Sequence, residues 1–466
     1  MYYTVERKDE FDMRKRMLSI LLCGCMLAGM TGCAGEDAVG GDTVTPGRGN
    51  EATNIPVENL ADGDLPTEAP EELPTETIDL MDGIELMSTE WNDNFPEHPI
   101  TQFGVPMFQN ALKEAENGEN VLVSPMSAWT ALCMVEAGAN GETKQQMQEV
   151  LAITEGDYLT YAKKFTFLLP NKDTYKVHMA NGIWYKNVPS LHVNDYFLQY
   201  NKTFFDAAAY KAPFDNSTLQ NINDWVSENT DGMIPGILEE IDPTDVIYLV
   251  NALSFDARWG KIYSETDIWN DIFTTEAGEE KLVSMMHSDE NLYLEDENTT
   301  GFIKYYDDKE YAFVALLPEE GMTMEEYVES LNAEKLRALF NGKKQIEVKA
   351  TMPKFSVDYG FNMNKILQQM GMTDAFSDSA ADFTAMATSD SGNIYVGSVD
   401  QKCFLAVDEY GTKAGAATAV AMQNKALSLQ PAKVVNLNRP FVYLIVECDN
   451  FEPLFMGTVM NVEETK

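Results

Sequence analysis

Apolar residues fill nearly every position of one segment, residues 128–137 (AWTALCMVEA). A helix that is apolar on all sides is normally buried, so we expect this one at the centre of the fold. Ser124 and Pro125 fit its start, because serine caps helix N-termini and proline is favoured at the first helical position. Gly138 fits its end.

A second helix is predicted over residues 143–151, because Thr143 and Gln146 have the spacing of a capping box. Strand-like runs rich in β-branched and aromatic residues then follow in irregular alternation with further helical segments. Such mixing, without strict βα repeats, predicts an α+β fold with large sheets. The runs are residues 245–255, 311–317, 344–353, 402–407, 440–447 and 454–460.

The first 32 residues have the pattern of a signal peptide. Three basic residues at 14–16 precede an apolar run over residues 17–32, which is short for a permanent membrane span. Cys33 follows directly. Met13 directly precedes the three basic residues and is a more natural start than Met1. Residues 1–12 are then a wrongly assigned extension of the chain.

Two cysteines are candidates for lipidation. Residues 30–33 (MTGC) resemble a bacterial lipoprotein box, in which Cys33 becomes the lipidated first residue, although Met30 replaces the usual leucine. The rival box at residues 22–25 leaves an unusually short apolar region before Cys25. We therefore expect a lipid on Cys33 and attachment to the outer face of a bacterial cell membrane.

Residues 33–95 are predicted to be a disordered acidic tether. From Ala34 onward this segment holds sixteen Asp or Glu, one basic residue (Arg48), and repeated Pro and Thr. Its composition supplies too little apolar surface to fold. Residues 78–86 are more apolar, so the boundary to the folded part is not sharp.

One domain is expected over residues 96–466, because no further linker or internal repeat interrupts it. The whole chain has 466 residues, 44% of them hydrophobic, and a formal net charge of −42. This charge repels polyanions, so nucleic acid is excluded as a partner. Four lysines form a weak basic patch, which in so acidic a domain is better explained as a solvated surface than as a site for a sulfated sugar. They are Lys163, Lys164, Lys172 and Lys176.

Cysteine and histidine usage gives no sign of a metal site or cofactor. Cys133, Cys403 and Cys448 are an odd number in apolar surroundings, so we expect buried free thiols. The sequence also lacks the GxSxG, HExxH, P-loop and GxGxxG motifs, so we do not expect an enzyme. The four histidines are isolated from one another: His98, His178, His192 and His287.

Several segments in this order resemble the serpins, the serine protease inhibitor superfamily. They cover essentially the whole globular part, and their combination is highly specific. The resemblance implies a serpin fold with three β-sheets, about eight or nine helices and an exposed reactive-centre loop. The segments are residues 120–151, 223–232, 250–259, 352–376, 407–420 and 438–461.

The resemblance also implies a set of residues that control opening of the main sheet. The family usually carries a histidine where this chain has Gln401, whose side chain can still donate and accept hydrogen bonds. Trp259 resembles the tryptophan at the upper end of that sheet. The full sheet-opening set is Ser124, Ser127, Asn251, Trp259 and Gln401.

In an inhibitory serpin, the segment after the hinge glutamate becomes a central strand of the main sheet. The hinge set implied here is Glu409, Gly411, Thr412, Ala414, Gly415, Ala416, Ala417 and Thr418. Because strand side chains alternate between faces, starting inward at Thr412 gives a small or apolar inward set. That set is Thr412, Ala414, Ala416, Thr418, Val420 and Met422, while the charged Lys413 points outward. Proline is absent from residues 409–430, so no ladder donor is lost.

Family spacing from Glu409 places the scissile bond at Lys425–Ala426. Lysine at this position fills the acidic specificity pocket of a trypsin-like protease. The segment up to Pro440 is longer than in typical relatives, so Met422 and Leu427 remain alternative cleavage positions.

The sequence therefore predicts a monomeric, surface-tethered suicide inhibitor that forms a covalent complex with an extracellular serine protease. Two alternatives remain. One is a non-inhibitory serpin-fold binding or display module, motivated by Gln401 and the long loop. The other is an inhibitor of a chymotrypsin-like, elastase-like or cysteine protease that cleaves at a shifted bond.

Overall fold

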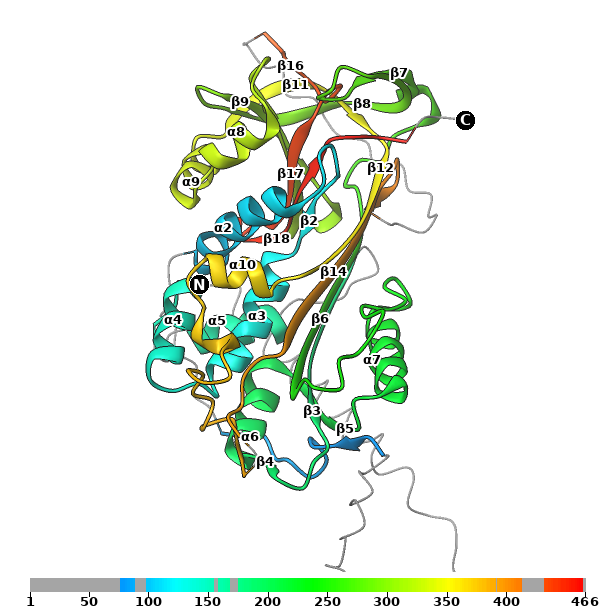
Figure 1. Cartoon of the computed structure of the whole chain (residues 1–466). Helices are drawn as coiled ribbons and strands as arrows, with labels where there is room; N and C mark the ends of the chain where they lie inside the picture. The colour runs from blue at the N-terminus through cyan, green and yellow to red at the C-terminus, as the bar shows by residue number, and fades with distance from the viewer. Residues whose placement is uncertain are drawn as a thin grey trace, which may run out of the picture. The chain divides into compact units, whose positions relative to one another are not determined.

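The computed structural model describes residues 76–88, 98–154, 158–167, 175–390, 392–412 and 431–463. These residues contain nine α-helices (Figure 1). Their bounds are α2 Pro99–Glu114, α3 Pro125–Glu136, α4 Gly141–Leu151, α5 Tyr158–Phe167, α6 Asp195–Phe205, α7 Asn216–Asn229, α8 Met324–Ser330, α9 Ala333–Asn341 and α10 Asn364–Gln369.

Three sheets form the rest of the described fold. The seven-stranded sheet has the order β1 (Ile78–Asp79), β5 (Ala208–Ala212), β3 (Tyr175–Lys186), β6 (Ile247–Arg258), β15 (Gly411–Thr412), β14 (Ser398–Val407) and β12 (Phe355–Asn362). The smallest sheet pairs β13 (Ala387–Ser389) with β4 (Leu191–Val193).

The nine-stranded sheet follows the order β16 (Lys433–Asn436), β11 (Lys344–Pro353), β8 (Glu280–Glu295), β9 (Thr299–Tyr305), β10 (Tyr311–Pro318), β17 (Phe441–Glu447), β18 (Pro453–Val459) and β2 (Leu122–Val123). Strand β7 (Ile268–Thr274) pairs with β8 beside this path. The predicted α+β fold with three sheets is confirmed, and each of the six strand-like runs overlaps one of these strands.

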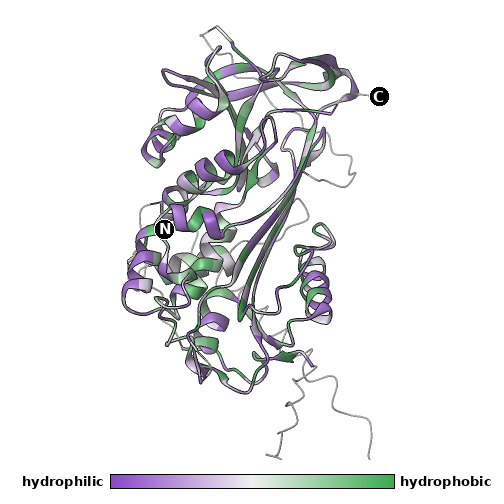
Figure 2. Ribbon diagram, viewed as in Figure 1, coloured by the Kyte–Doolittle hydropathy of each residue, from purple (hydrophilic) through white to green (hydrophobic). Residues whose placement is uncertain are grey.

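Helix α3 is buried along its whole length, as its apolar pattern predicts. Ser124 caps it by accepting a hydrogen bond from the Ser127 backbone N–H, and Pro125 takes the first helical position. On the other side of the seven-stranded sheet lies α7 (Figure 1), whose Ile222 and Val226 are buried in an apolar cluster with residues of β3 and β6. Figure 2 shows hydrophilic and hydrophobic residues mixed around α7, as expected for a helix with one packed face.

The capping box predicted at Thr143 and Gln146 is wrong. Helix α4 begins two residues earlier, at Gly141, with Asn140 in the capping position. Thr143 Oγ1 instead accepts from the Asp382 backbone N–H (3.0 Å). A tertiary contact thus uses the polar side chain that the local pattern had assigned to the helix start.

The tether predicted over residues 33–95 contains a part that packs on the globular body. Within residues 76–88, β1 pairs antiparallel with β5, and Met81 is buried. The Lys202 ammonium donates to the backbone oxygens of Met81 and Ile84, each at 2.8 Å. The described segment 76–88 therefore belongs to the folded part.

No helix among the residues that the structure describes combines the length and apolarity needed to cross a membrane.

Candidate functional site

The boundary between β6 and β14, which we call the seam, changes character along its length. In its lower half, residues 398–402 of β14 pair directly and in parallel with residues 248–252 of β6. At its upper end, the two residues of β15 lie between the strands and pair antiparallel with both. The first two residues of the hinge strand, Gly411 and Thr412, thus already lie between β6 and β14.

Gly411 is required here because the chain approaches β6 very closely. A Cβ atom at this position would lie 2.0 Å from the Ala257 carbonyl oxygen and 2.8 Å from Arg258 Cα. Neither contact is sterically allowed, and both neighbours are backbone. Close packing against β6 is therefore the reason for glycine at this hinge position.

Thr412 is completely buried, and its side chain lies on the inner face of the sheet. It is opposite Val407 of β14, which is also buried. The Thr412 and Tyr306 hydroxyls share a hydrogen bond of 2.5 Å. A polar hydroxyl at this buried position is therefore satisfied before any insertion occurs.

Three hydrogen bonds from two residues hold the hinge just before β15. The Trp259 backbone N–H donates to the Tyr410 carbonyl and its indole Nε1–H to the Asp408 carbonyl, both at 2.8 Å. The Tyr263 backbone N–H donates to the Glu409 carbonyl at 3.0 Å. Trp259 is thus a hydrogen-bonding anchor for the hinge as well as a buried aromatic.

The Trp259 indole is fixed by its own neighbours. Its ring stacks on Tyr306, with centroids 4.5 Å apart and planes 10° from parallel, and Phe313 meets it edge-on. Stacked and edge-on aromatic contacts both favour one orientation of the indole. This rigid support places the Nε1–H toward the hinge.

An ion pair joins the hinge glutamate to the start of β12. Lys354 Nζ lies 2.6 Å from the Glu409 carboxylate. Partial burial by itself raises the pKa of Glu409, but the Lys354 ammonium outweighs it and holds this pKa below its usual value. Glu409 therefore stays ionised at neutral pH and ties the hinge to the strand beside β14.

The Gln401 side chain is fully paired beneath the sheet. Its Oε1 accepts from the Ser124 backbone N–H (2.9 Å), and its Nε2 donates to the Ser124 carbonyl (3.0 Å). The Ser124 hydroxyl in turn donates to the Leu454 carbonyl (2.8 Å). Glutamine therefore links β14 to the start of α3 through both polar atoms of its side-chain amide.

The remaining polar groups of this set do not join the Gln401 network. Asn251 donates from Nδ2 to Asn181 Oδ1 of β3 at 2.5 Å. Asn251 Oδ1 and the Ser127 hydroxyl are buried and have no hydrogen-bond partner among the described residues. These two groups are unsatisfied while the seam is closed.

The structure brings together only part of the predicted site. Glu409, Gly411, Thr412 and Trp259 form the upper end of the seam, and Gln401, Ser124, Ser127 and Asn251 lie along or beneath its lower half. Other predicted positions lie outside the described residues: Cys33, Lys413, Ala414, Gly415, Ala416, Ala417, Thr418, Lys425 and Ala426.

Sequence reasoning missed Tyr306, Tyr263, Lys354 and Asn181. Each lies far from the hinge in sequence and contacts the site only through folding. Tyr306 lies 106 positions from Thr412, and nothing in the local pattern pairs the two residues.

The cysteines and histidines form no metal site among the described residues. Cys133 and Cys403 are buried free thiols, and Cys448 is half-buried. Burial raises the pKa of Cys403, so this thiol stays protonated at neutral pH.

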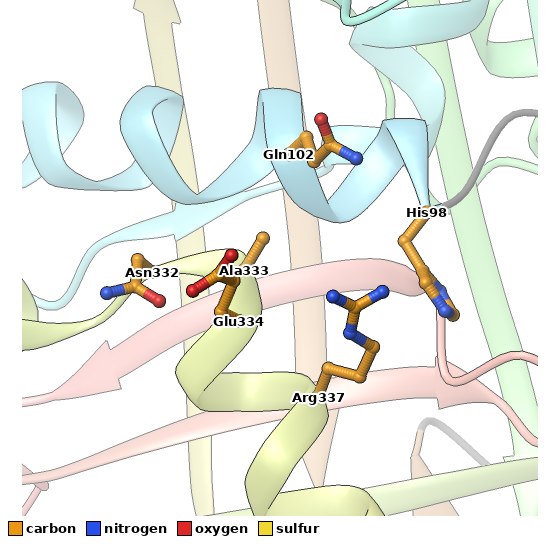
Figure 3. A pocket seen from close by; sticks show the side chains of 6 residues that line it. All are labelled: His98, Gln102, Asn332, Ala333, Glu334 and Arg337. Atoms are coloured by element: carbon orange, nitrogen blue, oxygen red, sulfur yellow. The ribbon is translucent and has the colours of Figure 1, made fainter.

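An open polar hollow lies elsewhere, between the start of α2 and α9. Figure 3 shows Glu334 and Arg337 on α9, with Gln102 and His98 at the start of α2. No residue of the hinge or the seam lines it. We assign it no part in the site.

Comparison with known proteins decides the family. Residues 98–462 match the family model described as serpin (serine protease inhibitor). The chain is a serpin. Human serpin B8 is 30% identical over 358 residues, which are 74% of this chain and 93% of that protein. An uncharacterized serpin-like protein of Thermococcus kodakarensis is 29% identical over 360 residues, covering 75% of this chain and 82% of the relative.

Solved serpin structures agree with the observed fold. The thermophilic serpin tengpin in its native state is 39% identical, with a TM-score of 0.77 over 83% of this chain and all of tengpin. The latent state of tengpin gives a TM-score of 0.70 over 81% of this chain. The direct β6–β14 pairing in this serpin leaves no inserted strand in the lower half of the seam.

Proposed function

We propose that this serpin is a suicide-type inhibitor of a trypsin-like serine protease, held on the outer face of a bacterial cell by a lipid on Cys33. The protease would attack the Lys425–Ala426 bond and form an acyl-enzyme. Insertion of the cleaved loop into the seam would then trap the enzyme as a covalent complex.

The observation that carries this proposal is the antiparallel register of β15. Thr412 faces buried Val407, and inward residues follow at every second position. Continuing this register brings small or apolar loop residues against buried residues of β14. The resulting pairs are Ala414 with Leu405, Ala416 with Cys403, Thr418 with Gln401, and Val420 with Val399.

The same register gives the buried polar groups a role. Thr418 would also lie opposite Asn251 of β6, whose Oδ1 has no partner among the described residues. A hydroxyl arriving there supplies the missing donor, and each such bond contributes about 1 kcal/mol. About a dozen new ladder bonds would supply on the order of 10 kcal/mol, which favours insertion over the closed seam.

Incubation of the mature chain with trypsin tests the mechanism. We expect an SDS-stable complex larger than the serpin and a single new N-terminus at Ala426. Cleavage without such a complex contradicts inhibition and favours the display module. A new N-terminus elsewhere in the loop, with a stable complex, supports inhibition through a shifted bond.

The cell-surface attachment is tested separately. The Cys33→Ser variant should be released into the medium, because it lacks the acylated residue, whereas the matched Cys25→Ser variant should stay in the membrane fraction. Release of the Cys25→Ser variant alone would move the lipid to the rival box.

A further inference from the structure

Lys304 is a buried cation directly behind the residues that hold the hinge. It lies on β9 with only 2% of its side chain exposed. Its Nζ is 2.8 Å from Glu290 Oε1 on β8 and 3.3 Å from the Lys261 carbonyl oxygen. Glu290 Oε1 also accepts from the Ser288 hydroxyl at 2.7 Å. The ion pair is therefore completed by further hydrogen bonds.

The ammonium group also lies against two aromatic rings. Lys304 Nζ is 4.5 Å from the centre of the Tyr263 ring and 5.3 Å from the centre of the Trp259 ring. Both distances fit cation–π attraction, which is strongest for desolvated cations. Tyr263 and Trp259 are the same two residues whose N–H groups hold the carbonyls of residues 408–410.

Fold stability alone does not explain a charged pair at this place. Burying two charges is expensive, and apolar side chains of similar volume are often equally stabilising. Burial by itself lowers the pKa of Lys304, but Glu290 and Tyr263 outweigh it and keep this pKa above its usual value. The lysine therefore remains charged, and its attraction for the two rings persists.

We propose that Lys304 and Glu290 are a positioning pair that holds the hinge at its starting position through Trp259 and Tyr263. The three hydrogen bonds from these two residues join the chain that follows β6 to residues 408–410, which follow β14, so they resist the further parting of β6 and β14 that insertion requires. By fixing both donors, the pair delays insertion of the uncleaved loop. Its importance for protease trapping rests on the proposed inhibitory function.

Amide hydrogen exchange of the intact chain tests the positioning directly and without protease. In the Lys304→Met variant, the backbone N–H groups of Trp259 and Tyr263 should exchange about tenfold faster, because loss of the cation–π contacts frees both rings. Lys304→Arg keeps the charge and should restore most of the protection. Glu290→Gln should give an intermediate rate, since the acceptor remains but the ion pair is lost.

Lys335 provides a matched control, because it also contacts a carboxylate and an aromatic ring but lies away from the hinge. Its ammonium lies 3.6 Å from Asp296 and 5.8 Å from the centre of the Tyr327 ring. Lys335→Met should leave exchange at Trp259 and Tyr263 unchanged. If it accelerates that exchange as much as Lys304→Met does, the effect is a general loss of stability and the proposal is wrong.

A second measurement follows conversion of the uncleaved chain to a heat-resistant, inserted form. Lys304→Met should convert about tenfold faster than the wild type at the same temperature. Equal rates in the two proteins, including the case in which neither converts, overturn the proposed delay. Because no protease is present, failure of this test is distinguishable from failure of inhibition, which shows as cleavage without complex in the wild type.

Discussion

The two halves of the seam are held shut in different ways. Its lower half is closed by direct parallel pairing of residues 398–402 with residues 248–252. Its upper end is separated by the two residues of β15: Thr412 shares a hydrogen bond with Tyr306, and the preceding residues 408–410 accept from Trp259 and Tyr263. Opening therefore has a direction, because the upper end is already parted and only the lower half requires ladder bonds to break.

The halves also differ in their polar chemistry. At the top, Glu409 is tied to Lys354, and the half-buried Asp408 accepts from the backbone N–H groups of Tyr410 and Gly411. Near the bottom, Asp400 has no ammonium or guanidinium partner among the described residues. Its carboxylate accepts from the Ser398 hydroxyl and from the Asn362 side-chain amide. Burial raises the pKa of Asp400. Asp400 thus lacks an ion pair like the one that ties Glu409 to Lys354 at the upper end.

The largest effect on this comparison is expected for Thr412→Arg, which places a charge in the buried first position of the seam. Burying an unpaired charge costs several kcal/mol, on the order of 3 or more, so insertion should become slower than deacylation. We expect trypsin to cut the same bond, with nearly complete loss of the SDS-stable complex. The ratio of cleaved serpin to complex measures this effect.

Lys413→Glu is the matched control for Thr412→Arg. Continuing the register of β15 would put residue 413 on the outer face of the sheet, so its charge reversal should hardly change the ratio of cleaved serpin to complex. If Lys413→Glu is the damaging variant, the inward and outward assignments are off by one residue. Binding to a catalytically inactive trypsin should be unchanged in both.

Gly411→Ala should remove β15 from the seam, because the added Cβ collides with the Ala257 carbonyl oxygen. Such overpacking typically costs about 1–3 kcal/mol. We expect faster amide exchange at Thr412 and Arg258, with the lower half of the seam unchanged. Equal acceleration at Val250 and Asp400 would show that the two halves open together.

Asp400→Asn should strengthen the lower half at neutral pH. A raised pKa in the folded state means that stability is lost as pH rises through the ordinary value of 3.8 toward the folded-state value. Asparagine removes this loss, so the variant should be more stable than the wild type at pH 7 and equal to it near pH 3. Urea unfolding across this range measures the difference, and equal stability at pH 7 contradicts the expectation.

Glu409→Gln should have the smallest effect. The pKa of Glu409 is lowered in the folded state, so its ion pair contributes stability above the ordinary value of 4.5 and loses it as pH falls through the lower folded-state value. Because both side chains are partly exposed, we expect a contribution of less than about 1 kcal/mol at pH 7. Urea unfolding of both proteins should show a small gap that closes on acidification.

Local patterns predicted much of the fold because they act within one element. The apolar run of α3, its Ser124 cap and the strand periodicity all survive in the structure. The hinge was recognised because Glu409, Gly411 and Thr412 are close in the chain and carry a family resemblance.

Contacts between distant segments could not be predicted in the same way. The Lys304–Glu290 pair joins neighbouring strands, and the Tyr306–Thr412 bond spans 106 positions of the chain. Thr143 was misassigned because its hydroxyl can cap a helix or bind a distant backbone N–H equally well. Only the folded arrangement decides between such partners.

The docked segment 76–88 has a mechanical consequence. A force applied to the chain before Glu76 acts first on the two β1–β5 residue pairs. It then acts on the hydrogen bonds from Lys202 to Met81 and Ile84. These contacts lie at the outer edge of the seven-stranded sheet, on the side of β6 away from the seam. Separating these contacts would add about 45 Å of extended chain from thirteen residues and would leave β6, β15 and β14 in place. If the chain is tethered and inhibitory as we propose, this edge would unfold under an applied force before the seam is disturbed.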